Sequence, residues 1–186
     1  GEYWEWLRTA LKMLYQLMTD QATLYCFHSD RGIYRLKEEA EKCGFLWKQT
    51  LIYYGVNGYR GMVRGAAHAT WSYCYEMICR FDKGTHGCPP AKKPPWFQAV
   101  LPCVRPQSNT RQGRNHPAQK PVNLMRCLVE FHDLGGGAVL DPMAGSGSTL
   151  VGCHRAGIPC LGIEQSSLYC EQIRQRLAHD GPELFQ

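Results

Sequence analysis

The chain of 186 residues is long enough for one domain with a hydrophobic core, and its 44% hydrophobic and 20% charged residues are ordinary for a globular protein. This composition excludes a disordered or collagen-like chain, no apolar run is long enough for a membrane span, and the N-terminal segment lacks the pattern of a secretory signal. The net charge of +5 is unevenly distributed, because residues 83–126 hold eight Lys or Arg and no Asp or Glu. Such a segment favours a polyanionic partner.

Hydrophobic periodicity predicts strands that alternate with helices, which implies an α/β fold with a mostly parallel sheet. Asp30 is expected to cap the second helix and Gly44 to end it. In chain order we expect a helix over 2–18, a strand over 23–27, a helix over 30–43, strands over 45–54 and 70–81, a helix over 122–132, a strand over 138–140, a helix over 148–156, a strand over 160–163 and a helix over 166–178.

Residues 82–117 interrupt this pattern. Eight of the eleven prolines fall between Pro89 and Pro121, which excludes a regular helix or a central strand there. We therefore predict a proline-rich basic insertion within a single domain that spans residues 1–186.

The ten cysteines include no C-x-x-C pair, and most of them lie inside apolar runs. This pattern predicts free thiols in a reducing, cytoplasmic environment rather than disulfides. A zinc site formed by Cys79, His86 and Cys88 is the weaker alternative because the spacing lacks paired ligands, so we expect no metal.

The segment from Ala138 to Leu150 reads AVLDPMAGSGSTL, a strand that ends in Asp141, a turn with Gly145 and Gly147, and then a helix. No Lys follows Gly147, which excludes a phosphate-binding P-loop. Glu164 ends the next strand 23 residues after Asp141, close to the spacing at which an acid binds the ribose of a nucleoside cofactor. A turn without any ligand is the alternative.

The run from Asp141 to Thr149, followed by Leu161-Gly-Ile-Glu164, resembles the S-adenosylmethionine-binding motif of DNA methyltransferases that modify exocyclic amino groups. These enzymes act on N6 of adenine or N4 of cytosine. The sequence HPAQKP, from His116 to Pro121, resembles the motif that precedes it in the family, in the permuted "beta" order with catalytic motifs first. The resemblance implies a Rossmann-like S-adenosylmethionine-dependent methyltransferase sheet.

The resemblance also assigns roles to individual residues. The turn would line the methionine end of the cofactor, Glu164 would hold the ribose, and residues 116–121 would close the pocket from the other side. Met143 stands where many members of the family carry Phe. The implied cofactor-binding residues are His116, Gln119, Lys120, Pro121, Asp141, Pro142, Met143, Ala144, Gly145, Gly147 and Glu164.

Double-stranded DNA is the partner that the resemblance implies for the basic segment. We expect this segment to contact DNA phosphates, although a solvated loop would have the same composition. The candidate DNA-binding residues are Lys92, Lys93, Arg111 and Arg114, with Arg60 and Arg64 of a glycine-rich loop as weaker candidates.

The family's catalytic tetrapeptide, an Asp, Asn or Ser followed by Pro-Pro and an aromatic residue, is expected upstream of Gly1. Within the chain, Lys93 precedes Pro94, Pro95 and Trp96, but lysine cannot accept a hydrogen bond from the target amino group. These three residues are therefore weak catalytic candidates. The sheet is accordingly expected to be incomplete, and the chain alone inactive without an N-terminal segment or a second subunit.

The sequence therefore predicts S-adenosylmethionine-dependent methylation of adenine N6 or cytosine N4 in DNA, as in restriction-modification systems, with this chain carrying the cofactor-binding part. The alternative is a catalytically inactive cofactor-binding or DNA-binding remnant or subunit. An upstream tetrapeptide in the reading frame would distinguish the two.

Overall fold

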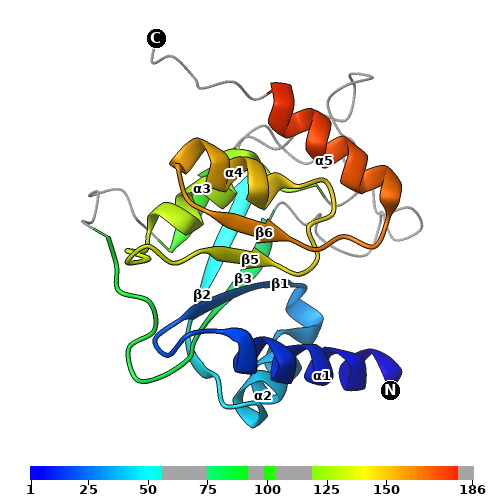
Figure 1. Cartoon of the computed structure of the whole chain (residues 1–186). Helices are drawn as coiled ribbons and strands as arrows, with labels where there is room; N and C mark the ends of the chain where they lie inside the picture. Colours follow the sequence, from blue (N-terminus) through cyan, green and yellow to red (C-terminus); the bar gives the residue numbers. More distant parts are fainter. Residues whose placement is uncertain (56–74, 92–98, 104–118, 180–186) are drawn as a thin grey trace. The chain divides into compact units, whose positions relative to one another are not determined.

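The computed structural model describes residues 1–55, 75–91, 99–103 and 119–179 (Figure 1). The chain forms two compact units. The first contains Gly1–Pro89 and Trp96–Pro102, and the second contains Pro90–Pro95 and Cys103–Gln186. The single domain with an insertion over 82–117 stays a prediction.

A four-stranded sheet forms the centre of the first unit, with the strand order β1-β3-β2-β4. Strand β3 runs antiparallel to both β1 and β2, so β1 and β2 are parallel to each other, and α2 lies between them in the chain. The elements are α1 (Glu2–Leu17), β1 (Thr23–His28), a 3-10 turn (Asp30–Gly32), α2 (Ile33–Lys42), β2 (Leu46–Gly55), β3 (Tyr75–Asp82) and β4 (Val100–Cys103).

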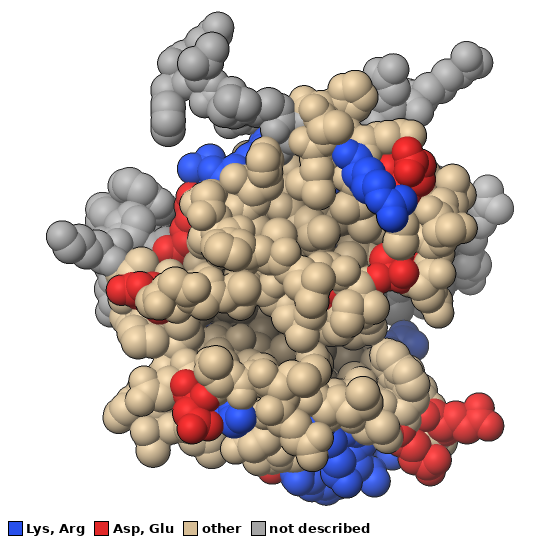
Figure 2. All heavy atoms as spheres, in the orientation of Figure 1, with Lys and Arg blue, Asp and Glu red and all other residues tan. Residues whose placement is uncertain are grey.

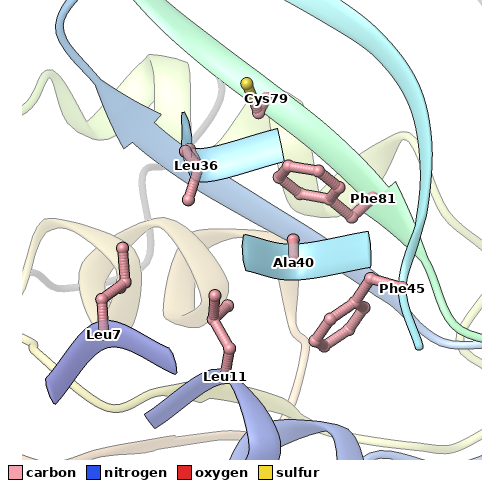
Figure 3. Close-up of a cluster of buried hydrophobic side chains, with 7 residues drawn as sticks. All are labelled: Leu7, Leu11, Leu36, Ala40, Phe45, Cys79 and Phe81. Atoms are coloured by element: carbon pink, nitrogen blue, oxygen red, sulfur yellow. The ribbon is translucent and has the colours of Figure 1, made fainter. Parts of the chain in front are cut away.

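Helices α1 and α2 bury their apolar stripes on one face of this sheet. Each helix contributes side chains four residues apart, which lie on the same helical face. Strand β3 contributes two side chains that are two residues apart and therefore share one face of the strand. Figure 3 shows the resulting cluster: Leu7, Leu11, Leu36, Ala40, Phe45, Cys79 and Phe81.

A charge network also joins α1 to α2. The side chain of Glu39 is 3% exposed, and its carboxylate accepts hydrogen bonds from Arg8 Nε and, at 3.2 Å, from Lys42 Nζ. The Arg8 hydrogen bond is the main cause that lowers the pKa of Glu39 from 4.5 to about 2, against the opposing effect of burial and with help from Lys42.

We predict that this network makes the unit less stable at low pH. Because the pKa of Glu39 is lower in the folded chain, its stabilisation is complete above about pH 4.5 and is lost as the pH falls toward about 2. The variant Glu39→Gln should lose this part of the pH dependence of the free energy of unfolding, measured by urea denaturation. As a control, Glu41→Gln breaks an exposed 3.9 Å pair with Lys37 and should keep the wild-type profile. An unchanged profile in Glu39→Gln would contradict the prediction.

The second unit contains a parallel pair of short strands, β5 and β6, in which Asp141 lies opposite Gly162. Helix α4 connects the two strands, as a parallel pair requires. A Cβ added at Gly152 of α4 would lie 2.8 Å from the backbone nitrogen of Arg126, so α3 and α4 pack closely. The elements are α3 (Val122–Glu130), β5 (Val139–Asp141), α4 (Ser148–Ala156), β6 (Cys160–Gly162) and α5 (Ser167–His179).

The predicted elements within the described residues are present, with three differences. Strand β4 was not predicted, because it lies inside the proline-rich segment 82–117; it is an edge strand, a position in which proline is tolerated. The 3-10 turn Asp30–Gly32 precedes α2, and the Asp30 carboxylate accepts a bond from Arg31 N at 2.9 Å instead of capping the helix. Gly44 does end the helix, with φ +98°. The described strands are also only partly parallel, because β3 inserts antiparallel between β1 and β2.

Eight of the cysteines have side chains that the structure describes, and all eight carry free thiols. Burial raises the pKa of Cys26 and of Cys153 to about 12, so these thiols are protonated and unreactive near neutral pH.

None of the described helices is both long and apolar enough to cross a membrane.

Candidate cofactor site

Asp141 is the last residue of β5 and lies at the carboxyl end of the parallel pair, where α/β folds bind ligands. Its side chain is half-buried, and Oδ1 accepts a hydrogen bond from Met143 N at 3.1 Å. The second oxygen, Oδ2, has no hydrogen bond within the described residues. The carboxylate can therefore accept a bond from a ligand while it holds the start of the turn.

The turn between Asp141 and α4 requires glycine at its end. Gly147 has φ +78°, and a Cβ added there would lie 2.7 Å from Ile173 Cγ1 of α5. Gly145 also has a positive φ, +54°. Both glycines adopt a left-handed conformation that other residues rarely adopt.

Glu164 ties this turn to the end of β6. Its Oε2 accepts a hydrogen bond from Gly145 N at 2.8 Å, and its Oε1 accepts one from Ser166 N, also at 2.8 Å. The sequence placed Glu164 at the same edge of the sheet as Asp141, and the structure adds its direct bond to the glycine turn. Each oxygen retains capacity for a second hydrogen bond.

The segment 119–121 lies against the first residue of α4. The Lys120 carbonyl accepts a hydrogen bond from Ser148 Oγ at 2.8 Å, and Pro121 is the residue that precedes α3. The structure therefore brings the described end of the segment 116–121 next to the glycine turn. Ten of the eleven predicted cofactor residues are described: Gln119, Lys120, Pro121, Asp141, Pro142, Met143, Ala144, Gly145, Gly147 and Glu164.

The remaining predicted site residues lie outside the described residues, so their roles stay predictions. Among the described residues, Lys and Arg side chains form several small groups on the face shown in Figure 2, with Asp and Glu side chains near them. The undescribed residues are His116 for the cofactor, Pro94, Pro95 and Trp96 for catalysis, and Arg60, Arg64, Lys92, Lys93, Arg111 and Arg114 for DNA.

Three residues that support the turn were not predicted. Ser148 and Ile173 were placed in helices by their hydrophobic pattern, but this pattern does not show which neighbour each would contact. Arg176 of α5 donates from Nη1 to the carbonyl of Ser146 inside the turn, and nothing in the sequence indicated this contact.

Over the described ranges, no three His, Cys, Asp or Glu side chains are grouped so that they could hold a metal ion. Cys79 lies in the apolar core of Figure 3.

The sequence model of one protein family, described as DNA methylase, matches residues 1–175. The chain belongs to the DNA methylase family. The methylase YubD of Escherichia coli (strain K12) is 29% identical over 174 residues, which cover 94% of this chain and 70% of YubD. The type II methyltransferase M2.DpnII of Streptococcus pneumoniae is 37% identical over 62 residues, which are 33% of this chain and 23% of that protein.

Solved structures of other DNA methyltransferases share the fold of this family member. The complex of M1.HpyAVI with S-adenosylmethionine has a TM-score of 0.77 at 23% identity, covering 92% of this chain and 81% of that one. The cytosine-N4-specific PvuII DNA methyltransferase has a TM-score of 0.77 at 14% identity, and the match covers 94% of this chain and 70% of that one. The family model confirms the predicted family, whereas the permuted order of its motifs stays a prediction. The solved structures confirm the Rossmann-like fold, and the ligand of the first agrees with the predicted cofactor.

The chemistry of the described residues fits S-adenosylmethionine. Asp141 Oδ2 is available to the ligand's ammonium group, and the Glu164 carboxylate can accept bonds from ribose hydroxyls in addition to its two backbone donors. Met143 is 58% exposed at the turn and offers an apolar, polarisable surface.

Proposed function

We propose that the chain binds S-adenosylmethionine at the turn 141–147 and Glu164, and that this site serves the methylation of adenine N6 or cytosine N4 in double-stranded DNA. The observation that carries the proposal is the convergence of two carboxylates on one glycine turn, with Glu164 Oε2 2.8 Å from Gly145 N. A turn that only linked a strand to a helix would not need both acids at the same edge.

In this function, S-adenosylmethionine supplies an electrophilic methyl group. Asp141 would bind the ammonium group of its methionine part, and Glu164 would hold the ribose by charge-assisted hydrogen bonds. Residues 119–121 would close the pocket from the opposite side. Fixing the cofactor in this way sets the position of its methyl group before the target base arrives.

The target amino group lies inside the DNA duplex, so the base has to leave the stack before a methyl group can reach it. The acceptor-Pro-Pro-aromatic tetrapeptide that would orient this amino group is expected upstream of Gly1. That expectation stays a prediction, as do the need for an upstream segment or second subunit and the cytoplasmic location of the enzyme.

Two measurements test the proposed function. Isothermal titration calorimetry should detect binding of S-adenosylmethionine to the chain, and a radiolabelled methyl-transfer assay should detect labelled duplex DNA once an upstream segment with the tetrapeptide is supplied. Cofactor binding without any transfer in that longer protein would favour the non-catalytic alternative. No cofactor binding at all would refute the proposal.

The basic segment gives a separate prediction for DNA. Changing Lys92, Lys93, Arg111 and Arg114 to Ala should weaken DNA binding and flatten the slope of log affinity against log salt by up to about 3.6, or about 0.9 per phosphate contact. A control with the same loss of charge replaces Lys12, Arg31, Lys37 and Arg174 and should keep the wild-type slope. Equal slopes in the wild type and the first variant would show that the segment is a solvated loop.

A further inference from the structure

One side chain connects the two sides of the candidate cofactor site. The glycine turn 141–147 leads into α4, and the segment 119–121 leads into α3. Ser148, the first residue of α4, is 6% exposed and donates its hydroxyl hydrogen to the Lys120 carbonyl at 2.8 Å. The hydrogen bond therefore joins two segments that are 28 residues apart in the sequence.

The hydroxyl of Ser148 is not used to cap its own helix. The N-cap of α4 is Gly147, and that position makes no side-chain hydrogen bond to the helix end. Serine at a helix start commonly bonds to a nearby backbone N–H, but here it is a donor to a carbonyl from another segment. The Lys120 carbonyl, in turn, belongs to residues 119–121, which lie outside any helix or strand.

The packing on both sides of Ser148 restricts how far the two bonded segments can move relative to each other. Helices α3 and α4 approach closely at Gly152, where an added Cβ would lie 2.8 Å from Arg126 N. The Ser148 bond extends this packing to the residues just before α3. On the other side of Ser148, the turn is held by Glu164 and by the Arg176 bond to the Ser146 carbonyl.

We propose that Ser148 is a positioning residue for the cofactor: its hydroxyl holds segment 119–121 at a fixed distance from the turn 141–147, so that both sides of the pocket are in place before S-adenosylmethionine binds. The inference rests on the proposed function. A preformed pocket binds more tightly because less ordering is needed at the moment of binding.

The test compares Ser148→Ala, which removes the hydroxyl, with Ser148→Thr, which retains it. Thr149→Val is the matched control, because it removes a hydroxyl from the next residue of the same helix, which is also buried. The dissociation constant for S-adenosylhomocysteine is measured by calorimetry, the dissociation constant for duplex DNA by fluorescence anisotropy, and the hydrogen exchange of the amides of residues 119–125 by mass spectrometry without ligand.

Ser148→Ala should bind S-adenosylhomocysteine about 5- to 50-fold more weakly, exchange residues 119–125 faster, and keep its DNA affinity. Ser148→Thr should restore both the cofactor affinity and the slow exchange, and Thr149→Val should resemble the wild type. A folded Ser148→Ala chain with wild-type affinity and exchange would overturn the inference, and so would an equal loss in Thr149→Val. If the wild type binds no S-adenosylhomocysteine, the proposed function itself fails, and the inference fails with it.

Discussion

Replacing Asp141 with Ala should weaken the binding of S-adenosylmethionine by about 1–3 kcal/mol, which corresponds to about 5- to 150-fold in the dissociation constant. The variant removes the oxygen that is available to the ligand's ammonium group, and it also removes the hydrogen bond from Met143 N. Glu164→Ala should weaken cofactor binding at least as much. It removes the ribose contact and also leaves Gly145 N and Ser166 N without the carboxylate that accepts their hydrogen bonds. Calorimetric titration of each variant measures the effect.

A carboxylate in the loop between α3 and β5 provides the control. Asp133 accepts a hydrogen bond from Gly135 N at 3.0 Å, which resembles the bond that Asp141 makes to its own turn. Asp133→Ala should therefore change stability slightly and leave cofactor affinity unchanged. Wild-type affinity in both Asp141→Ala and Glu164→Ala would reject the assignment of the site.

Gly147→Ala should destabilise the second unit by about 2–5 kcal/mol and abolish measurable cofactor binding. A left-handed backbone costs a non-glycine residue about 1–2 kcal/mol, and forcing a methyl group against packed side chains costs about 1–3 kcal/mol more. Both conditions hold here, since φ is +78° and the added Cβ would lie 2.7 Å from Ile173 Cγ1. Urea unfolding and calorimetry measure the two effects.

Gly157→Ala separates the two contributions. Gly157 has φ +66°, but an added Cβ there would meet nothing within 4 Å. This variant should show only the backbone cost, about 1–2 kcal/mol, and should retain cofactor binding. If both variants lose the same stability, the contact with Ile173 does not constrain the turn.

The sequence predicted most of the local structure because apolar periodicity and glycine position are local signals. The strand that ends at Asp141 and the helix that begins at Ser148 both follow from this pattern. The order of the strands in the four-stranded sheet did not follow from these local signals. Strand β3 lies between β1 and β2, and such a placement depends on contacts between distant segments rather than on spacing within one segment.

The candidate site was predictable as a set of residues but not as a network of bonds. Motif resemblance identified Asp141 and Glu164, yet it did not show that Glu164 would bond directly to Gly145. The supporting contacts of Ser148 and Arg176 were also missed. Each of these contacts joins a side chain to the backbone of another segment. The sequence of a helix does not indicate which distant carbonyl its serine or arginine will bind.

Backbone amide NMR during titration with S-adenosylhomocysteine tests most directly whether the glycine turn and Glu164 bind this cofactor. Chemical-shift changes should be saturable and concentrated in residues 119–121, 141–147 and 164–166, and they should be lost in Asp141→Ala at the same ligand concentration. An absence of shift changes in the wild type, or changes centred on the first unit between Glu2 and Asp82, would contradict the assignment of the cofactor site.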